Sequence, residues 1–131
     1  MQAAQSSHRA SDADYATIAE LQLRMERLLD ALDKEAEAYA NARQITEFAS
    51  DRRKTALADA FTAIQSNDPE ASATAAEHRA RASQGYKDKM KQLMQDHMKA
   101  ETVLANYDVL KTRLDVARSL LAVERVKVER L

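Results

Sequence analysis

A single proline and a single glycine in 131 residues constrain the fold of this chain more than any other feature. The proline belongs to the run Ser66-Asn67-Asp68-Pro69, whose residues all favour turns or helix ends. A sheet, a phosphate-binding loop or a pocket of crossing loops would need more turns than the chain offers. The sequence therefore predicts an all-α fold, a long antiparallel hairpin with helices at about residues 12–65 and 69–131.

Composition supports long helices and indicates self-association. Charged residues make up 31% of the chain and aromatic residues 5%, a profile typical of coiled coils. A two-helix hairpin has a narrow hydrophobic seam and a large surface, so we expect a homo-oligomeric coiled-coil bundle. The chain has no cysteine, which excludes disulfides and thiolate sites. No apolar run approaches the ~20 residues of a membrane span, so we expect no membrane partner and a cytoplasmic location in a bacterium or an infected host cell.

The start of the chain separates a tail from one helical domain. Residues 1–10 are polar without periodicity, which predicts a disordered tail before a single hairpin domain at residues 11–131. Ser11 is a candidate N-cap, and Asp14 three residues later can reach back to it. The first helix is therefore expected to begin here.

Apolar residues at spacings of three and four predict a coiled-coil seam on the first helix. The seam residues are Ile18, Leu21, Met25, Leu28 and Leu32. After Leu32 the stripe thins toward alanines, which bury little area. The polar run at residues 50–55 could mark a kink, but without glycine or proline we expect the helix to continue.

The second helix is expected to begin at the proline. Asp68 suits the N-cap and Pro69 the first helical position, where a missing N–H costs nothing. Alanines then allow tight packing against the end of the first helix. Glycine lowers helix stability by ~1 kcal/mol relative to alanine, so residues 83–85 are the favoured place for a second break, which would give three segments.

The seam of the second helix runs almost to its end. Its members are Tyr86, Met90, Leu93, Leu104, Leu110, Leu114 and Leu121. His97 lies on the same line, where a polar residue more often fixes register than binds a metal. A repeated three-residue step after Tyr107 indicates local overwinding or a change of partner. Together with the first stripe, these residues are the candidate oligomer seam.

Charge is distributed unequally between the two halves. Residues 1–77 carry eight basic and 14 acidic side chains, whereas residues 78–131 carry 12 and seven. One interpretation is an acidic helix lying beside a basic one. The other is a basic face that binds phosphates, with an affinity that falls steeply as the salt concentration rises. The candidate nucleic-acid-binding residues are Arg79, Arg81, Lys87, Lys89, Lys91, Lys99, Lys111, Arg113 and Arg118.

Two other features of the sequence could also contact a nucleic acid: two tyrosines and a second basic cluster. Tyr86 and Tyr107 could stack on bases, but both fall on the seam, where packing is the simpler interpretation. Arg52-Arg53-Lys54 forms a shorter cluster whose default interpretation is a solvated helix face.

The sequence contains no recognisable catalytic, metal or cofactor motif. A di-iron bundle needs Glu-x-x-His on two helices, yet Ala75 and Met94 stand three residues before His78 and His97. Gly-x-Ser-x-Gly, His-Glu-x-x-His and glycine-rich phosphate motifs are also missing. We therefore expect a protein that is not an enzyme and carries no cofactor.

The stretch from Ala82 onward resembles small helical proteins that phages encode among their recombination and replication genes. The residues that carry this resemblance are Ala82-Ser83, Tyr86-Lys87, Ala100-Glu101, Tyr107, Leu110-Lys111, Arg113, Ala117-Arg118-Ser119 and Glu124-Arg125, with a looser match at Tyr39, Ala42, Arg53-Lys54 and Leu57. By size and layout these proteins are similar to UvsY-type recombination mediators.

The resemblance implies a non-enzymatic accessory protein of phage-type recombination. Such a protein would bind single-stranded DNA or recombination proteins as a helical oligomer, with basic residues of the second helix facing DNA. Near-neutral net charge departs from this expectation. The alternative is a structural coiled-coil adaptor or scaffold that recognises a protein helix through its seam.

Overall fold

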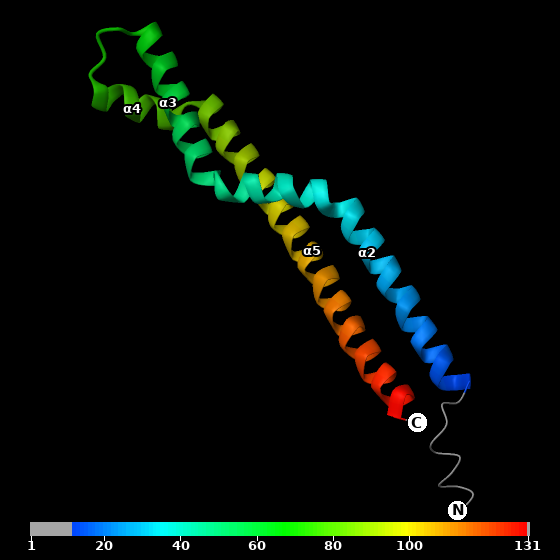
Figure 1. The fold of residues 1–131 in the computed structure, drawn as a ribbon. Helices are drawn as coiled ribbons and strands as arrows, with labels where there is room; N and C mark the ends of the chain where they lie inside the picture. The colour runs from blue at the N-terminus through cyan, green and yellow to red at the C-terminus, as the bar shows by residue number, and fades with distance from the viewer. Residues whose placement is uncertain (1–11, 131) are drawn as a thin grey trace, which may run out of the picture. The chain divides into compact units, whose positions relative to one another are not determined.

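The computed structural model describes residues 12–130, with side chains described from residue 15 onward. Four helices follow one another: α2 (Asp12–Glu47), α3 (Ala49–Asn67), α4 (Ala73–Ala82) and α5 (Gln84–Arg130) (Figure 1). The predicted all-α fold is confirmed, since residues 12–130 contain no strand. No helix in this part of the chain is both long and apolar enough to cross a bilayer. The expected tail at residues 1–10 and the cap formed by Ser11 and the Asp14 side chain lie outside what the structure describes.

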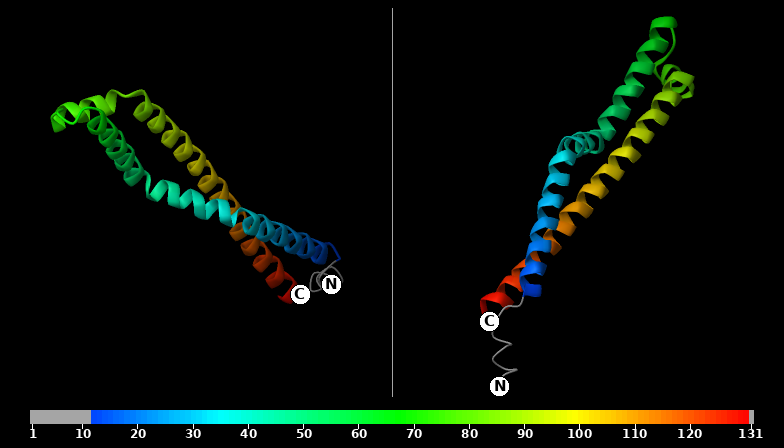
Figure 2. Two further views of the ribbon diagram at one scale, coloured as in Figure 1. Left: turned by 90° about the horizontal axis from the view of Figure 1, so that it is seen from above. Right: turned by 90° about the vertical axis from the view of Figure 1, so that its right-hand side faces the viewer.

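The helices form two compact units. In unit 1, residues 12–37 of α2 run antiparallel to residues 105–130 of α5 (Figure 2). Unit 2 comprises residues 38–104, which include the end of α2, all of α3 and α4, and the beginning of α5. Both long helices therefore supply residues to both units.

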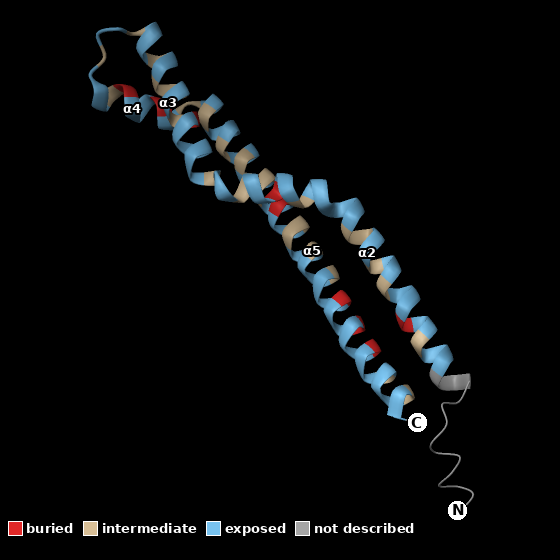
Figure 3. Cartoon of the chain, in the orientation of Figure 1, coloured by how far each residue is buried: buried red, intermediate tan, exposed pale blue. Residues whose placement is uncertain are grey.

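The leucine seam packs within unit 1. Leu21 of α2 and Leu114 and Leu121 of α5 are buried, at 7%, 5% and 4% exposure (Figure 3). The other predicted seam residues of this unit are half-buried: Ile18, Met25, Leu28, Leu32 and Leu110. Burying a leucine side chain contributes about 1.5–3 kcal/mol, so these contacts stabilise the pairing of α2 with α5. The seam packs within one chain, and its role in an oligomer stays a prediction.

Unit 2 has an alanine core. Its buried hydrophobic residues among those described are Ala42, Ala56, Ala76, Ala80 and Ala100. Ala76 and Ala80 are completely buried where α4 packs against α3. The predicted seam residues of this unit are only half-buried: Tyr86, Met90, Leu93 and Leu104. Small side chains let helix backbones approach closely but remove little apolar area from water.

The first predicted helix is divided at Phe48, which corrects the expectation of one helix to residue 65. Phe48 has φ −99° and ψ 15°, outside the α-helical region. Two residues earlier, the Thr46 hydroxyl donates to the carbonyls of Ala42 and Arg43 at 3.2 and 3.0 Å, and back-bonding of this kind often accompanies a bend. The backbone hydrogen bonds continue across the interruption, because the Phe48 N–H donates to the Gln44 carbonyl at 3.0 Å and the Arg52 N–H to the Phe48 carbonyl at 2.9 Å. The polar run at residues 50–55 is continuous helix within α3.

The predicted cap at Asp68 and helix start at Pro69 are wrong. Asp68 ends α3, and its N–H donates to the Ile64 carbonyl at 2.9 Å. The Asp68 carboxylate accepts from Arg79 Nη1 at 2.8 Å, so it is engaged away from the cap position. Ser72 is the N-cap of α4 and accepts from the Ala75 N–H at 3.2 Å. The turn therefore spans residues 68–72.

The predicted break near residue 85 is confirmed and lies at Ser83. This residue has φ −66° and ψ 144°, an extended conformation between α4 and α5. Its hydroxyl donates to the Ala80 carbonyl at 2.7 Å and accepts from the Tyr86 N–H at 3.3 Å. One serine thus ends one helix and caps the next, while Gly85 is part of α5 with no positive φ.

Candidate binding groove in unit 2

An open groove in unit 2 is lined by side chains from α2, α3 and α5. It encloses about 500 Å³. Its lining residues are Ile45, Ala49, Arg52, Arg53, Met90, Lys91, Leu93, Met94 and His97. We call this the basic groove. Helical spacing explains the set, because Met90, Leu93, Met94 and His97 recur at i, i+3, i+4 and i+7 on one face of α5.

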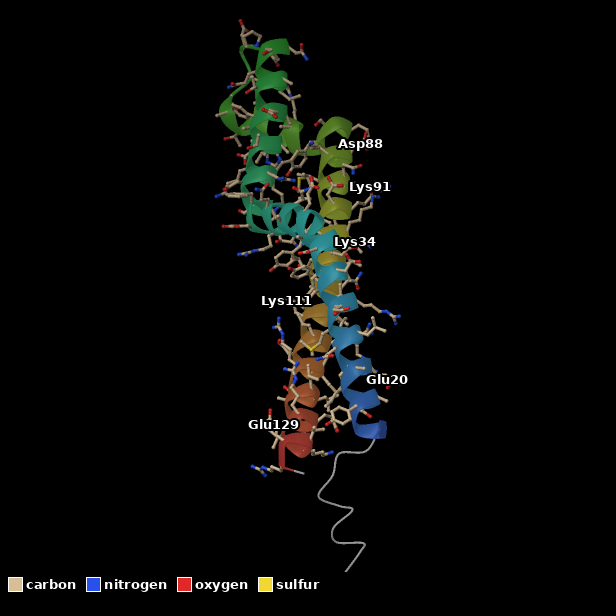
Figure 4. All side chains as sticks on the ribbon, turned by 45° about the vertical axis from the view of Figure 1, so that its right-hand side comes forward. Glu20, Lys34, Asp88, Lys91, Lys111 and Glu129 are labelled. Atoms are coloured by element: carbon tan, nitrogen blue, oxygen red, sulfur yellow. The ribbon has the colours of Figure 1, made fainter. Side chains whose placement is uncertain are left out.

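The edge of the basic groove is positively charged. Arg52 and Arg53 come from α3 and Lys91 from α5, and all three are exposed. Lys91 is labelled in Figure 4. The lining includes no carboxylate, and no ion pair of these three cations occurs among the described residues. The fold therefore joins the short Arg52-Arg53 cluster to a lysine of the predicted basic face.

The floor of the groove is apolar and includes adaptable side chains. Ile45, Met90 and Leu93 are half-buried, whereas Met94 is 66% exposed. Methionine has three rotatable bonds and a polarizable sulfur, so it adjusts to ligands of different shape.

His97 adds an unused hydrogen-bonding atom beside the floor. Its Nε2 atom lies 3.0 Å from Glu101 Oε1, one turn along α5. Its Nδ1 atom is buried and has no hydrogen-bond partner in the described part of the chain. A ring that donates from Nε2 to Glu101 keeps Nδ1 as an acceptor, which a donor on a ligand would satisfy.

A neighbouring cleft in unit 2 has mixed charge. It encloses about 860 Å³ and shares Arg52 and Leu93 with the basic groove. Its carboxylates are Asp51, Asp59 and Asp96, which oppose the charge of Arg52 and Lys89. Tyr86 lines this cleft and is half-buried, as its place on the seam predicts. An anionic ligand is therefore better matched by the basic groove than by this cleft.

The other predicted basic residues of unit 2 do not join the groove. Arg79 pairs with Asp68 at 2.8 Å, and Arg81 with Glu77 at 3.0 Å. Lys87 is exposed on α5 outside the groove lining, and Lys99 lines a shallow surface hollow together with Asp96. The predicted continuous basic face is thus divided among several surfaces.

The basic residues of unit 1 lie on a helix that packs beside the acidic part of α2. Lys111 lies over the Tyr107 ring at 5.9 Å, which explains Tyr107 without a bound base (Figure 4). Arg118 is 3.9 Å from Asp115 on the same helix, and Arg113 lines a groove of about 470 Å³ with Leu28. Among the described residues of unit 1, each ion pair joins two residues of the same helix. The opposite charges of α2 and α5 therefore interact over longer distances.

Some of these groove residues carried a sequence signal. Arg52 and Arg53 were recognised as a cluster, but their distance from Lys91 depends on how α3 packs against α5. Ile45, Ala49 and Arg52 recur at i, i+4 and i+7, a helical face that the break at Phe48 obscures. Met94 lies off the leucine line and gave no signal of its own.

Metal chemistry has no candidate site in the described residues, which hold no suitable group of three His, Cys, Asp or Glu side chains. Comparison of the chain with protein-family models, curated proteins and solved structures finds no significant match. The functional argument therefore depends on the groove itself.

Proposed function

We propose that this chain is a non-enzymatic accessory protein that binds an acidic, amphipathic segment of a partner protein in the basic groove. The observation that carries the proposal is the groove lining, which combines three cations, no carboxylate and an apolar floor. A ligand that matches it needs apolar side chains on one face and carboxylates beside them.

A helical segment of the partner fits this description best. An amphipathic helix inserts apolar residues at i, i+3, i+4 and i+7 into a hydrophobic groove. Met90 and Met94 can adapt to those residues, while Arg52, Arg53 and Lys91 attract the flanking carboxylates. This is the adaptor function expected as the alternative from sequence, with the groove in place of the seam as its binding surface.

Single-stranded DNA is the second candidate. The three cations in a groove lining that includes no carboxylate favour it, because such a cluster attracts phosphates. The resemblance to phage recombination-region proteins gives the same expectation. The lack of large stacking platforms weakens this candidate, because the groove lining has no Phe, Tyr or Trp side chain. Either ligand is compatible with an accessory role in phage-type recombination.

Fluorescence anisotropy with two labelled probes separates the candidates. The first probe is a synthetic helical peptide with leucines on one face and glutamates beside them, and the second is an oligothymidylate. We expect the peptide to bind and Met94→Asp to abolish its binding, because the substitution puts a carboxylate on the apolar floor. A change of Arg52 and Arg53 to glutamate should weaken binding by ~10-fold or more.

Lys54→Glu is the matched control, since Lys54 follows Arg53 in α3 and is exposed but does not line the groove. It should leave peptide binding almost unchanged. If DNA is the ligand, oligothymidylate should bind instead, and three phosphate contacts would lower its affinity roughly 20-fold between ~50 and ~200 mM salt. Binding of neither probe, or equal weakening by Lys54→Glu, would contradict the assignment of the groove.

A further inference from the structure

A second apolar stripe runs along α5 in unit 1 and lies entirely on the surface. Its seven residues are Ala105, Val109, Thr112, Val116, Ser119, Val123 and Val126. They alternate at spacings of four and three, the heptad pattern of a coiled coil. All seven are exposed, with Val116 and Val123 at 52% each. We call these residues the valine stripe.

The valine stripe lies across α5 from the leucine seam, and its residues Thr112 and Val116 also line a groove with Arg24 and Leu28 of α2. At ~100° per residue, its centre lies roughly 160° around α5 from Leu114 and Leu121. Those leucines pack against α2 within the chain, so the seam is occupied while the valine stripe is open. If α5 mediates self-association, the face available is therefore the valine stripe and not the predicted leucine seam.

The charges beside the valine stripe are arranged for a second copy of the same helix. Asp108, Asp115 and Glu129 lie along one edge of the stripe. Each comes immediately before a heptad position of the valines, namely residues 109, 116 and 130. The other edge carries Arg113 and Lys127. In two parallel, in-register copies an edge residue faces the residue five positions later in the partner, so Asp108 faces Arg113, while Asp115 faces Leu120 and Ala122 faces Lys127. Antiparallel copies bring like-charged edges together. The Asp108–Arg113 contact therefore favours the parallel orientation.

We propose that two copies of this chain associate in parallel and in register through the valine stripe of α5. The heptad positions before the three-residue steps are Val109, Val116 and Val123, which meets one of the two conditions for a two-stranded parallel coiled coil. The other condition is leucine at the alternate position, which is occupied here by Thr112, Ser119 and Val126. In this register, Asp108 of each copy faces Arg113 of the other. Neither residue has an ion-pair partner among the described side chains, so both are available for this contact.

Analytical ultracentrifugation tests the association on the full chain. We expect a concentration-dependent mass that rises from 14.7 kDa toward twice that value. Val116→Asp should give a monomer with unchanged helical circular dichroism, because Val116 is exposed and contributes little to the fold of one chain. Leu23→Asp is the matched control: Leu23 is an exposed apolar residue on α2, and the variant should still associate. A wild-type chain that stays monomeric would overturn the proposal.

A charge exchange tests the orientation. Asp108→Arg alone and Arg113→Asp alone should each weaken association, because each places like charges together. The double variant should restore it, since the pair is re-formed with its charges exchanged. If the double variant is weaker than both single variants, the parallel register is wrong.

Cysteine cross-linking gives an independent result, since the chain has no cysteine of its own. Val109→Cys and Val123→Cys, each tested alone, should both form disulfide-linked dimers on mild oxidation, because equivalent positions meet in a parallel pair. An antiparallel pair would instead link the first variant to the second in a mixture, with little self-linkage of either. Absence of all linkage in a chain that dimerises would also reject this interface.

Discussion

Unit 1 and unit 2 use the same element, an antiparallel pairing of helices, but they bury different residues. Unit 1 buries leucines at positions 21, 114 and 121 together with Ala117, whereas every buried hydrophobic residue described in unit 2 is an alanine. The three helix interruptions, at Phe48, residues 68–72 and Ser83, all lie in unit 2. Burying a leucine removes more apolar area from water than burying an alanine, so the core of unit 1 is expected to be the more stable of the two. Stability and binding are therefore assigned to different units.

The largest effect should come from the leucine core of unit 1. Leu114→Ala is expected to lower the free energy of unfolding by about 2–4 kcal/mol, because it deletes buried methyl groups and leaves a cavity. Leu29→Ala is the matched control, since Leu29 is 43% exposed on α2 and its truncation should cost about 0.5 kcal/mol or less. Urea titration followed by circular dichroism measures both. If both variants lose the same free energy of unfolding, the leucine seam does not stabilise the chain more than an exposed leucine does.

The alanine core of unit 2 should respond to enlargement. Ala80→Leu forces a larger side chain into the contact between α4 and α3, which should destabilise the chain by about 1–3 kcal/mol. Ala82→Leu, two residues later on an exposed position, should be close to neutral. Thermal unfolding compares the pair. A neutral Ala80→Leu variant would mean that α4 is not held against α3.

Ser83 connects α4 and α5, and replacing it should lower the stability of unit 2. Ser83→Ala removes both hydroxyl hydrogen bonds and should cost about 1 kcal/mol, the usual value of a cap. Ser50→Ala, at an exposed position within α3, should be neutral or slightly stabilising because alanine favours helix. Urea titration should show a lower midpoint for the first variant alone. No difference between them would make Gly85 the better explanation of the break.

The smallest effect concerns the ion pair that fixes the turn. Arg79→Gln breaks the contact with Asp68 and should cost under ~1 kcal/mol, because both side chains are about half exposed. The loss should shrink at high salt, where the pair is already screened. Arg81→Gln, which breaks a pair within α4, is the comparison. A loss that does not depend on salt would indicate packing in place of charge.

The helices and the leucine seam were predictable because their signal is local and repeated. Spacings of three and four placed Leu21, Leu114 and Leu121 on the packed faces, and the burial of these residues agrees. Helix ends were less predictable, because neighbouring residues compete for the same role. Asp68 and Ser72 are both good caps; the Ser72 hydroxyl accepts from the Ala75 N–H, while the Asp68 carboxylate accepts from Arg79.

The binding groove could be predicted only in part, since it depends on contacts between helices. The sequence identifies Arg52 and Arg53 as a basic cluster but does not place them beside Lys91. The valine stripe is different, because Val109, Val116 and Val123 recur every seven residues in the sequence itself. What the sequence leaves open is which of two stripes on α5 packs within the chain, and the burial of Leu114 and Leu121 decides this for the leucines.

Amide hydrogen exchange resolved along the chain tests the central claim most directly, namely that unit 1 carries the stable core and unit 2 the adaptable one. It is best measured on Val116→Asp, so that protection reports the fold of a single chain. We predict the slowest exchange at residues 18–32 and 107–121, and faster exchange through α3, α4 and the start of α5. Protection that is uniform, or greatest at residues 73–82, would contradict the account.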